Sequence, residues 1–175
     1  YLKSIKRNKI LILLPYFERE IVYMINLINN IPYLKDTLYV KFHPAASSVK
    51  HKNLLTANAI ITTDDLYELF KTTKIVIGAA TGSMVEAACF SIPSIVIKNS
   101  NGVTLNYFDE YGKGVIWDYA ESTNDVMSLV EKYTQSLSQN RGKKIIDECG
   151  TYYKSNFFTK PTKDVIMNAF DLESL

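Results

Sequence analysis

The 175-residue chain contains few of the residues that build metal centres and disulfide frameworks. Its two cysteines, Cys89 and Cys149, lack the CxxC spacing of a metal or redox site. Its two histidines, His43 and His51, are too few for a histidine-rich zinc site. We therefore expect two buried, reduced thiols in a cytoplasmic protein, and no metal or other cofactor.

Long apolar runs and blocks of one charge are also missing. No apolar stretch approaches the roughly 20 residues that a membrane-spanning helix needs. The segment 1–7 contains neither an initiator methionine nor the core of a signal peptide, so we expect the chain to be part of a longer protein. The formal charge is +2 and the basic residues are scattered, which argues against a nucleic-acid-binding stripe. Anionic substrates, or peripheral contact with the inner face of an anionic membrane, remain compatible with this charge.

What the chain does contain is a regular alternation of apolar and amphipathic segments. Strands that are apolar throughout, separated by helices, are typical of a parallel sheet covered on both faces. We therefore expect a doubly wound, Rossmann-like α/β domain of about six strands. The expected strands are 9–14, 37–42, 58–62, 74–77, 94–97 and 113–117. The expected helices are 18–30, 64–71, 83–90 and one that Thr123 caps.

The stretch 75–89 is the most informative part of the chain. A β-branched run stops at Gly78 and passes through a Thr-Gly-Ser turn, 81–83, into a helical pattern of small residues. The start of such a helix offers unpaired N–H groups and the positive end of the helix dipole. Gly82 has no side chain to keep a phosphate away, and Glu86 could reach sugar hydroxyls beside that phosphate. The pattern predicts a site for a nucleoside diphosphate or a nucleotide-sugar.

The same residues also allow a purely structural interpretation. Ser83 and Glu86 have the spacing of a capping box, in which both side chains would bond to the helix backbone. His43, which precedes Pro44 at the end of a strand, could simply cap that strand. Their place in the sheet favours a functional role, because doubly wound sheets bind ligands outside the carboxyl ends of their strands. The segments expected at those ends are His43, 62–64, 78–83 and 98–102.

Several other polar and aromatic residues have structural explanations. Asp64 and Asp65 are expected to cap a helix rather than to act as catalytic carboxylates. Tyr107, Tyr111 and Trp117 are expected to belong to the core rather than to stack on a ligand.

The C-terminal segment departs from the alternation. Residues 152–158 are expected to be irregular, and Pro161 is expected to introduce a final helix that runs through Phe170. We therefore divide the chain into a nucleotide-sugar-binding domain, 1–150, and an aromatic tail with its helix, 151–175. The tail is expected to cover the domain's own edge or to dock onto a partner domain, and in isolation it would favour self-association. Its large rings are those of Tyr152, Tyr153, Phe157 and Phe158.

Four segments, taken in order, resemble a known family. They are Lys41-Phe-His43-Pro44, Leu66-Tyr67-x-Leu69-Phe70, the stretch from Ile75 through Thr81-Gly82-Ser83 to Glu86-Ala87, and Ser91-Ile-Pro93-Ser-Ile-Val. Together they resemble the C-terminal domain of GT-B glycosyltransferases, over roughly 9–170. The likeness is closest to bacterial enzymes of surface polysaccharides: capsule polymerases, polysialyltransferases and teichoic-acid glycerophosphotransferases.

This resemblance implies a donor-binding half with a CMP-, CDP- or UDP-activated donor as its substrate. It also implies an N-terminal domain that holds the acceptor and lies outside this chain, so the chain alone would turn over little or nothing. By the same resemblance, His43 contacts the donor phosphate or assists departure of the leaving group, and Glu86 holds the ribose hydroxyls. The other donor-binding residues that it implies are Pro44, Thr62, Gly78, Thr81, Gly82 and Ser83.

Two other functions fit the same residues. UDP-N-acetylhexosamine 2-epimerases share the GT-B architecture and a similar phosphate-binding turn, and they also work across a cleft between two domains. A non-catalytic nucleotide-binding or scaffold domain of a polysaccharide assembly complex would have no measurable affinity for an activated sugar. The sequence does not identify the nucleotide, the sugar, the acceptor or the general base.

Overall fold

The computed structural model describes residues 7–31, 38–46, 48–55, 59–99, 104, 107–158, 162 and 167. Its centre is a six-stranded sheet in the order β3-β2-β1-β4-β5-β6, in which every pair of neighbours is parallel. The strands are β1 (Lys9–Leu13), β2 (Leu38–Lys41), β3 (Ala59–Ile61), β4 (Thr73–Ala79), β5 (Ser94–Ile97) and β6 (Trp117–Ala120). The helices are α1 (Glu18–Asn29), α2 (Ser48–His51), η1 (Lys52–Leu54), α3 (Leu66–Thr72), α4 (Gly82–Cys89), α5 (Thr123–Ser138) and α6 (Asn140–Phe157).

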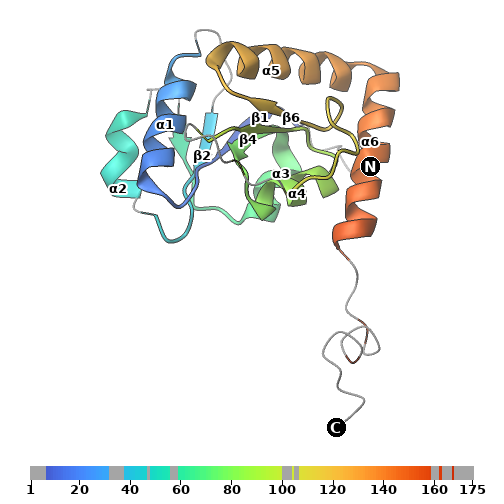
Figure 1. The fold of residues 1–175 in the computed structure, drawn as a ribbon, viewed down its shortest axis with the longest axis horizontal. Coiled ribbons are helices and arrows are strands. Elements are labelled where there is room, and N and C mark those ends of the chain that lie inside the picture. The colour runs from blue at the N-terminus through green and yellow to red at the C-terminus, as the bar shows by residue number, and fades with distance from the viewer. Residues whose placement is uncertain are drawn as a thin grey trace, which may run out of the picture.

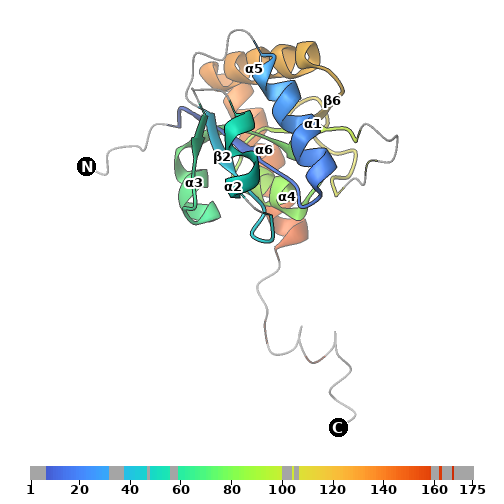
Figure 2. The same ribbon diagram turned by 90° about the vertical axis from the view of Figure 1, so that its left-hand side faces the viewer.

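Helices cover both faces of this sheet, as the sequence predicted. In Figure 1, α5 lies above the sheet, α3 and α4 lie below it, and α6 runs down one side. Figure 2, turned by 90°, again places α5 on the opposite side of the sheet from α3 and α4. The doubly wound α/β fold is therefore confirmed.

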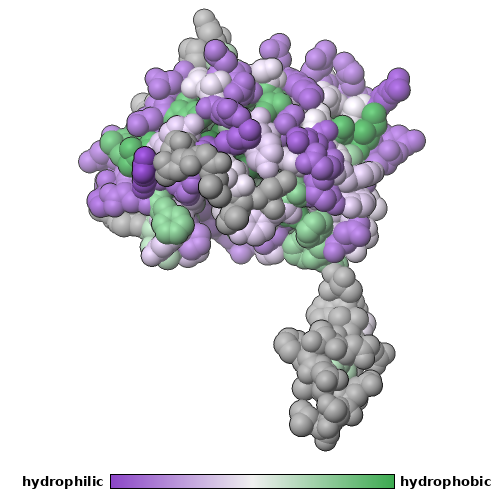
Figure 3. Space-filling model, in the orientation of Figure 1, coloured by the Kyte–Doolittle hydropathy of each residue, from purple (hydrophilic) through white to green (hydrophobic). Residues whose placement is uncertain are grey.

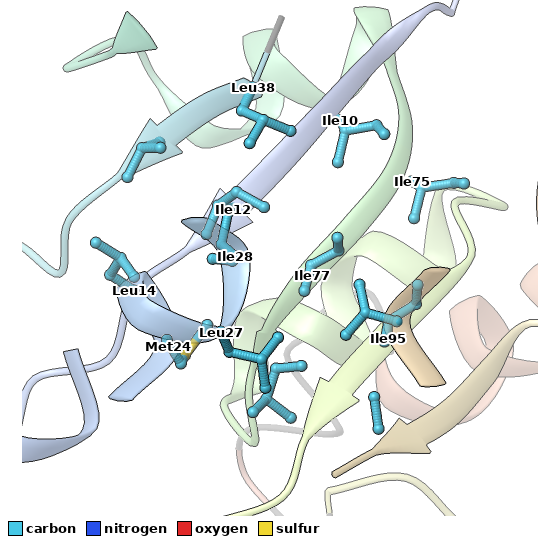
Figure 4. Packing of buried hydrophobic residues seen from close by; sticks show 14 of the residues in the cluster. Ile10, Ile12, Leu14, Met24, Leu27, Ile28, Leu38, Ile75, Ile77 and Ile95 are labelled. Atoms are coloured by element: carbon cyan, nitrogen blue, oxygen red, sulfur yellow. The ribbon is translucent and has the colours of Figure 1, made fainter. Parts of the chain in front are cut away.

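Alternation along the strands divides the core into two layers. On β1, Ile10 and Ile12 face α1 and α5, whereas Leu11 and Leu13 face α3, α4 and α6. The first layer is shown in Figure 4, where isoleucines of β1, β4 and β5 meet Met24, Leu27 and Ile28 of α1. Because both faces of each central strand are buried, the strands read as continuous apolar runs. Outside these layers the face seen in Figure 3 is mostly hydrophilic, with small separated apolar patches.

Two expected boundaries near the end of the sheet are wrong. The sixth strand was expected at 113–117, but β6 begins at Trp117, because Gly112 and Gly114 take positive φ angles of 70° and 75° and turn the chain before it. Helix α5 is capped by Ser122 rather than by Thr123, which is the first helical residue. Trp117 is fully buried, as predicted.

The aromatic tail is also different from the expectation. Residues 152–157 are helical, because they continue α6, which runs unbroken past residue 150. Tyr153 is fully buried in this domain, and its hydroxyl donates to the Asp109 carboxylate over 2.9 Å and to the Tyr111 carbonyl over 2.7 Å. Its ring therefore belongs to this domain's own core, whereas Phe157 and Phe158 remain exposed. The helix expected after Pro161 lies almost entirely outside the described residues.

The strand order reverses between β1 and β4, which are neighbours in the sheet but lie far apart in sequence. From β1 the chain goes to β2 and β3 on one side, and from β4 it goes to β5 and β6 on the other. The connections that leave the carboxyl ends of β1 and β4 therefore diverge, and a crevice opens between them. In doubly wound sheets this switch point is the usual place for a ligand.

Candidate functional site

The start of α4 lies at this switch point and is open. The helix begins at Gly82, and Thr81 is its N-cap residue in an extended conformation, but the Thr81 side chain makes no capping hydrogen bond. Within an α-helix the first N–H groups have no intrahelical partner, so the amides of Gly82 and Ser83 point outward at the positive end of the dipole. This arrangement can bind the oxygens of a phosphate.

The capping-box interpretation of Ser83 and Glu86 is wrong. It required Ser83 to stand before the helix, whereas Ser83 is already the second helical residue. The Glu86 carboxylate instead raises the pKa of the nearby Tyr67 hydroxyl on α3. Glu86 is half-buried and lines the cleft in front of α4. Its carboxylate is therefore not used to close the helix start.

The two glycines of the motif have different surroundings. A Cβ atom on Gly78 would lie 2.7 Å from the sulfur of Met84 and 3.1 Å from the carbonyl oxygen of Leu13, so glycine lets α4 and β1 approach β4 closely. A Cβ atom on Gly82 would meet nothing within 4 Å. The structure therefore gives Gly78 a packing role and leaves open space beside Gly82, where a ligand could approach.

His43 follows β2 and faces the same crevice. Its Nδ1 accepts a hydrogen bond from the Ala45 amide over 3.2 Å, so in the neutral ring the proton resides on Nε2. Its ring packs edge-on against Tyr16, with the centroids 5.6 Å apart. The Ala45 bond is the structural role that the sequence allowed, and it leaves Nε2–H as a hydrogen-bond donor. Both roles are compatible in one side chain.

Two clefts meet at His43 and Thr81. The first, called here the α3-side cleft, has a volume of about 740 Å³ and lies between the end of β2, the start of α3 and the start of α4. It brings together six of the residues that the sequence singled out. They are His43, Pro44, Thr81, Gly82, Ser83 and Glu86.

The second, called here the α1-side cleft, has a volume of about 520 Å³ and lies between the start of α1 and the segments that follow β4 and β5. Its walls include the aromatic rings of Tyr16, Phe17, Tyr23 and Tyr107. Tyr107 was expected in the core, but its side chain is 49% exposed, and Tyr111 is 46% exposed, so this expectation is wrong for both. Sequence reasoning did not single out Tyr16 and Phe17. They follow Pro15 directly after β1, at the carboxyl edge of the sheet, and that position is the signal that could have found them.

Two predicted residues lie outside both clefts. The Thr62 amide donates to the Val40 carbonyl over 2.9 Å, and its hydroxyl accepts from the Asp64 amide over 3.1 Å. Thr62 thus shapes the turn after β3, and the neighbouring Thr63 lines the α3-side cleft instead. Gly78 is buried beneath α4.

The acidic residues near the α3-side cleft have structural partners. Asp65 caps α3, because its carboxylate accepts from the amides of Tyr67 and Glu68 over 2.9 and 3.3 Å, which confirms the prediction for Asp65 but not for Asp64. The Lys41 ammonium group donates to the carbonyl oxygen of Asp64 over 2.6 Å and so links the ends of β2 and β3. In the part of the chain that the structure describes, no three His, Cys, Asp or Glu side chains are grouped to hold a metal ion.

Neither cysteine forms a disulfide. Burial raises the pKa of Cys89 to about 11, and Glu86 adds to this shift. The thiol therefore stays protonated near neutral pH. Within the described ranges, no helix has the length and apolar character needed to span a membrane.

Comparison with protein-family models finds no match, and comparison with curated proteins finds none either. Solved structures do match. Glycosyltransferase SnogD from Streptomyces nogalater is similar with a TM-score of 0.59 and 14% identity, over 86% of this chain and 40% of that protein. Spinosyn rhamnosyltransferase SpnG, complexed with thymidine diphosphate, matches with a TM-score of 0.52 and 12% identity, over 86% of this chain and 43% of SpnG.

The wall teichoic acid polymerase TagF, solved after a soak with CDPG, matches with a TM-score of 0.50 and 15% identity, over 94% of this chain and 40% of TagF. This chain thus spans about two fifths of the length of these proteins. At such identities the likeness establishes the fold. The chain has the fold of a GT-B glycosyltransferase C-terminal domain, as its motifs predicted.

Proposed function

We propose that this chain is the donor-binding half of a bacterial glycosyltransferase or glycerophosphotransferase for surface polysaccharide synthesis. The observation that carries the proposal is the uncapped start of α4, which faces the switch point of the sheet next to His43. Two proteins of the same fold, SpnG and TagF, were solved with thymidine diphosphate and CDPG. We propose a CMP-, CDP- or UDP-activated donor for this chain.

In this proposal each element of the crevice has one task. The amides of Gly82 and Ser83, with the hydroxyls of Thr81 and Ser83, hold the donor phosphates. Glu86 accepts hydrogen bonds from the ribose hydroxyls in the α3-side cleft. Pro44 forms part of the wall of that cleft.

The proposed chemistry depends on charge that develops during transfer. An acceptor oxygen forms a bond to the transferred group while the bond to the nucleotide phosphate breaks, and the nucleotide leaves with the bonding electron pair. Negative charge therefore grows on the leaving phosphate. The α4 amides and the Nε2–H group of His43 would bind this charge more strongly than the ground state, which lowers the barrier. The acceptor and the general base would be supplied by an N-terminal domain, since this chain spans about two fifths of its structural relatives.

The test is calorimetric titration of the intact protein with CMP, CDP and UDP, together with its Glu86→Gln variant. Loss of a hydrogen-bonded charge should weaken the affinity for the bound nucleotide about tenfold, because such bonds contribute more than neutral ones. The thermal midpoint should change little, because Glu86 caps no helix. Glu68→Gln is the matched control, since Glu68 is an exposed carboxylate of α3 outside both clefts. No affinity of the wild type for any of the three nucleotides would overturn the proposal and favour a scaffold domain.

Product analysis with the intact protein distinguishes transfer from epimerisation. Sugar or glycerophosphate on an acceptor supports the proposal, whereas inversion at C2 of a UDP-N-acetylhexosamine without an acceptor overturns it. In the same assay His43→Ala should lower turnover more than donor affinity, because its interaction strengthens as charge develops. Wild-type turnover in this variant would remove His43 from the mechanism.

A further inference from the structure

The α1-side cleft continues the proposed phosphate site into a second space. His43 and Thr81 line both clefts, so the start of α4 lies where the two clefts meet. A nucleoside in the α3-side cleft, with its phosphates at the start of α4, would direct the group beyond the phosphates into the α1-side cleft. The chemistry of this second cleft therefore bears on which group the donor carries.

Three aromatic rings on the walls of the α1-side cleft are open to solvent. The exposed fractions are 54% for Tyr16, 64% for Phe17 and 49% for Tyr107. Phe17 is the N-cap residue of α1, where its side chain makes no capping hydrogen bond, and its ring packs edge-on against Tyr16 with the centroids 5.3 Å apart. Packing in the core does not explain these rings. Exposed aromatic faces in a cleft offer apolar contact to a ligand.

The polar groups of the same cleft can bind hydroxyls. The Glu20 carboxylate accepts a hydrogen bond from the Asn99 side-chain amide over 2.9 Å, and the Thr104 hydroxyl accepts from the Asn99 backbone amide over 2.8 Å. All three residues line the cleft and are half-buried. An ionised carboxylate has about four acceptor positions, so the bond from Asn99 orients Glu20 and still leaves it able to accept from a ligand.

The charges of the cleft favour an uncharged ligand over an acidic one. The Lys98 ammonium group lines the cleft but is paired with the Glu121 carboxylate over 2.5 Å, so its charge is already balanced. Glu20, by contrast, is bonded to the uncharged amide of Asn99. A carboxylate on the ligand would therefore be repelled by Glu20, since like charges at short range repel each other.

These features distinguish between the groups that a nucleotide can carry. A pyranose has a face of C–H groups that can lie on an aromatic ring, and hydroxyls at its edge that can donate to a carboxylate. Glycerol has a hydroxyl on every carbon and no extended apolar face. An acidic sugar has the pyranose face but adds a carboxylate. The cleft volume of about 520 Å³ is ample for one pyranose ring.

We infer that the α1-side cleft binds the transferred group of the donor, and that this group is a neutral pyranose rather than glycerol phosphate or an acidic sugar. The inference rests on the proposed function, because it takes the donor phosphates to lie at the start of α4. It adds the class of the transferred group, and it assigns selection of that group to the Phe17 ring and the Glu20 carboxylate.

The test compares esters that share a nucleotide. Calorimetry of the intact protein is carried out with UDP-glucose against UDP-glucuronate, UDP-galactose against UDP-galacturonate, and CDP-glucose against CDP-glycerol. The neutral sugar should bind about fivefold or more tightly in the UDP pairs, because the uronates add a like charge beside Glu20. It should bind about two- to tenfold more tightly in the CDP pair, the range expected for contact with an aromatic face.

Two variants assign these preferences to the cleft. Phe17→Leu keeps an apolar side chain but removes the ring, so affinity for the neutral sugar esters should fall about two- to tenfold while affinity for free UDP and CDP stays unchanged. Phe90→Leu is its matched control, because Phe90 is 38% exposed and lines neither cleft. Glu20→Gln keeps an acceptor for Asn99 and removes the charge, so the preference for glucose over glucuronate should fall about fivefold. Glu68→Gln should leave that preference unchanged.

Each contrary outcome is recognisable. Tighter binding of CDP-glycerol than of CDP-glucose assigns the cleft to glycerol phosphate, and tighter binding of uronates or of CMP-N-acetylneuraminate than of neutral esters assigns it to an acidic sugar. Equal losses of UDP and UDP-glucose affinity in Phe17→Leu show that the rings bind the nucleotide. Unchanged sugar affinity in Phe17→Leu, or unchanged preference in Glu20→Gln, places the sugar elsewhere. These results overturn the inference and leave nucleotide binding standing, whereas a wild type that binds neither CMP, CDP, UDP nor their esters overturns the proposed function as well.

Discussion

Helices α4 and α5 both begin where a strand ends at the carboxyl edge of the sheet, but their first turns differ. At the start of α5, the Ser122 hydroxyl accepts from the Asp125 amide over 3.2 Å and the Asp125 carboxylate accepts from the Ser122 amide over 2.9 Å, so a complete capping box closes the helix. At the start of α4, the Thr81 side chain makes no such bond. Serine and an acidic residue three positions later occur in both segments.

The difference shows that a helix start without a side-chain cap keeps backbone N–H donors that a ligand can bind. Capping typically stabilises a helix by about 1 kcal/mol, and α4 forgoes this contribution although Thr81 is a residue type that caps well. The same N–H groups that a cap would bind are directed into the crevice between β1 and β4. The three predictions that follow separate stability from binding at these two helix starts.

The largest change in stability is expected at Gly78, where α4 packs against β4. Gly78→Ala places a methyl group 2.7 Å from the Met84 sulfur and should lower the free energy of unfolding by about 1–3 kcal/mol through overpacking. Gly82→Ala is the matched control. It adds the same methyl group where nothing lies within 4 Å, so stability should stay equal or rise by up to about 1 kcal/mol while nucleotide affinity falls. Urea unfolding and calorimetry give both quantities, and an equally destabilising Gly82→Ala would contradict the contrast.

The next effect compares the two caps directly. Ser122→Ala should lower the free energy of unfolding by about 1 kcal/mol and leave nucleotide affinity unchanged, because it removes a formed cap away from both clefts. Thr81→Ala should change stability by less than about 0.5 kcal/mol, since no capping bond is lost, and should weaken nucleotide binding. An equal decrease in the free energy of unfolding for both variants would contradict this contrast, because it would mean that Thr81 caps α4 in solution.

The smallest effect concerns the pH dependence of the α5 cap. The Ser122 hydroxyl, followed by the Glu121 and Ser122 amides, lowers the pKa of Asp125 from its usual 3.8. A lowered pKa stabilises the fold above the usual pKa, and this contribution disappears as pH falls through the folded-state value. Because Asp125 is exposed, the contribution should be only about 0.5 kcal/mol. Unfolding of wild type and Asp125→Asn should differ by this amount at pH 7, and the difference should shrink only as pH falls below 3.8 and through the lowered folded-state pKa. A difference that does not change with pH would assign it to packing.

The fold could be predicted because it depends on a pattern that is local in sequence. Continuous runs such as that in β4 identify buried parallel strands, and the order of strands and helices then limits the topology. The start of β6 could not be placed from the sequence. The apolar residues that follow the turn at Gly112 and Gly114 look like a strand, although β6 begins only at Trp117. The helical state of residues 152–157 was missed because the two tyrosines and two phenylalanines of 152–158 resemble a tail, whereas Tyr153 is held by Asp109, far away in sequence.

The candidate site could be predicted only for the parts that lie within one continuous segment of sequence. The Thr81-Gly82-Ser83 turn and His43 were found because they directly follow strands. Sequence spacing could not distinguish the capping pair Ser122 and Asp125 from the similar pair Ser83 and Glu86, because the difference lies in where the helix begins.

The hydrogen bonds at the end of α6 also affect which parts of the domain unfold together. Tyr153 donates to Asp109 and Tyr111, the Trp117 indole donates to the same Tyr111 carbonyl over 3.1 Å, and the Tyr152 hydroxyl donates to the Asp109 carboxylate. These bonds fasten the last turns of α6 to the connection between β5 and β6. Helix ends usually fray and exchange their amide hydrogens first. We therefore expect the last turns of α6 and the loop from Asp109 to Trp117 to unfold and exchange as one cooperative unit, with the protection of an interior helix.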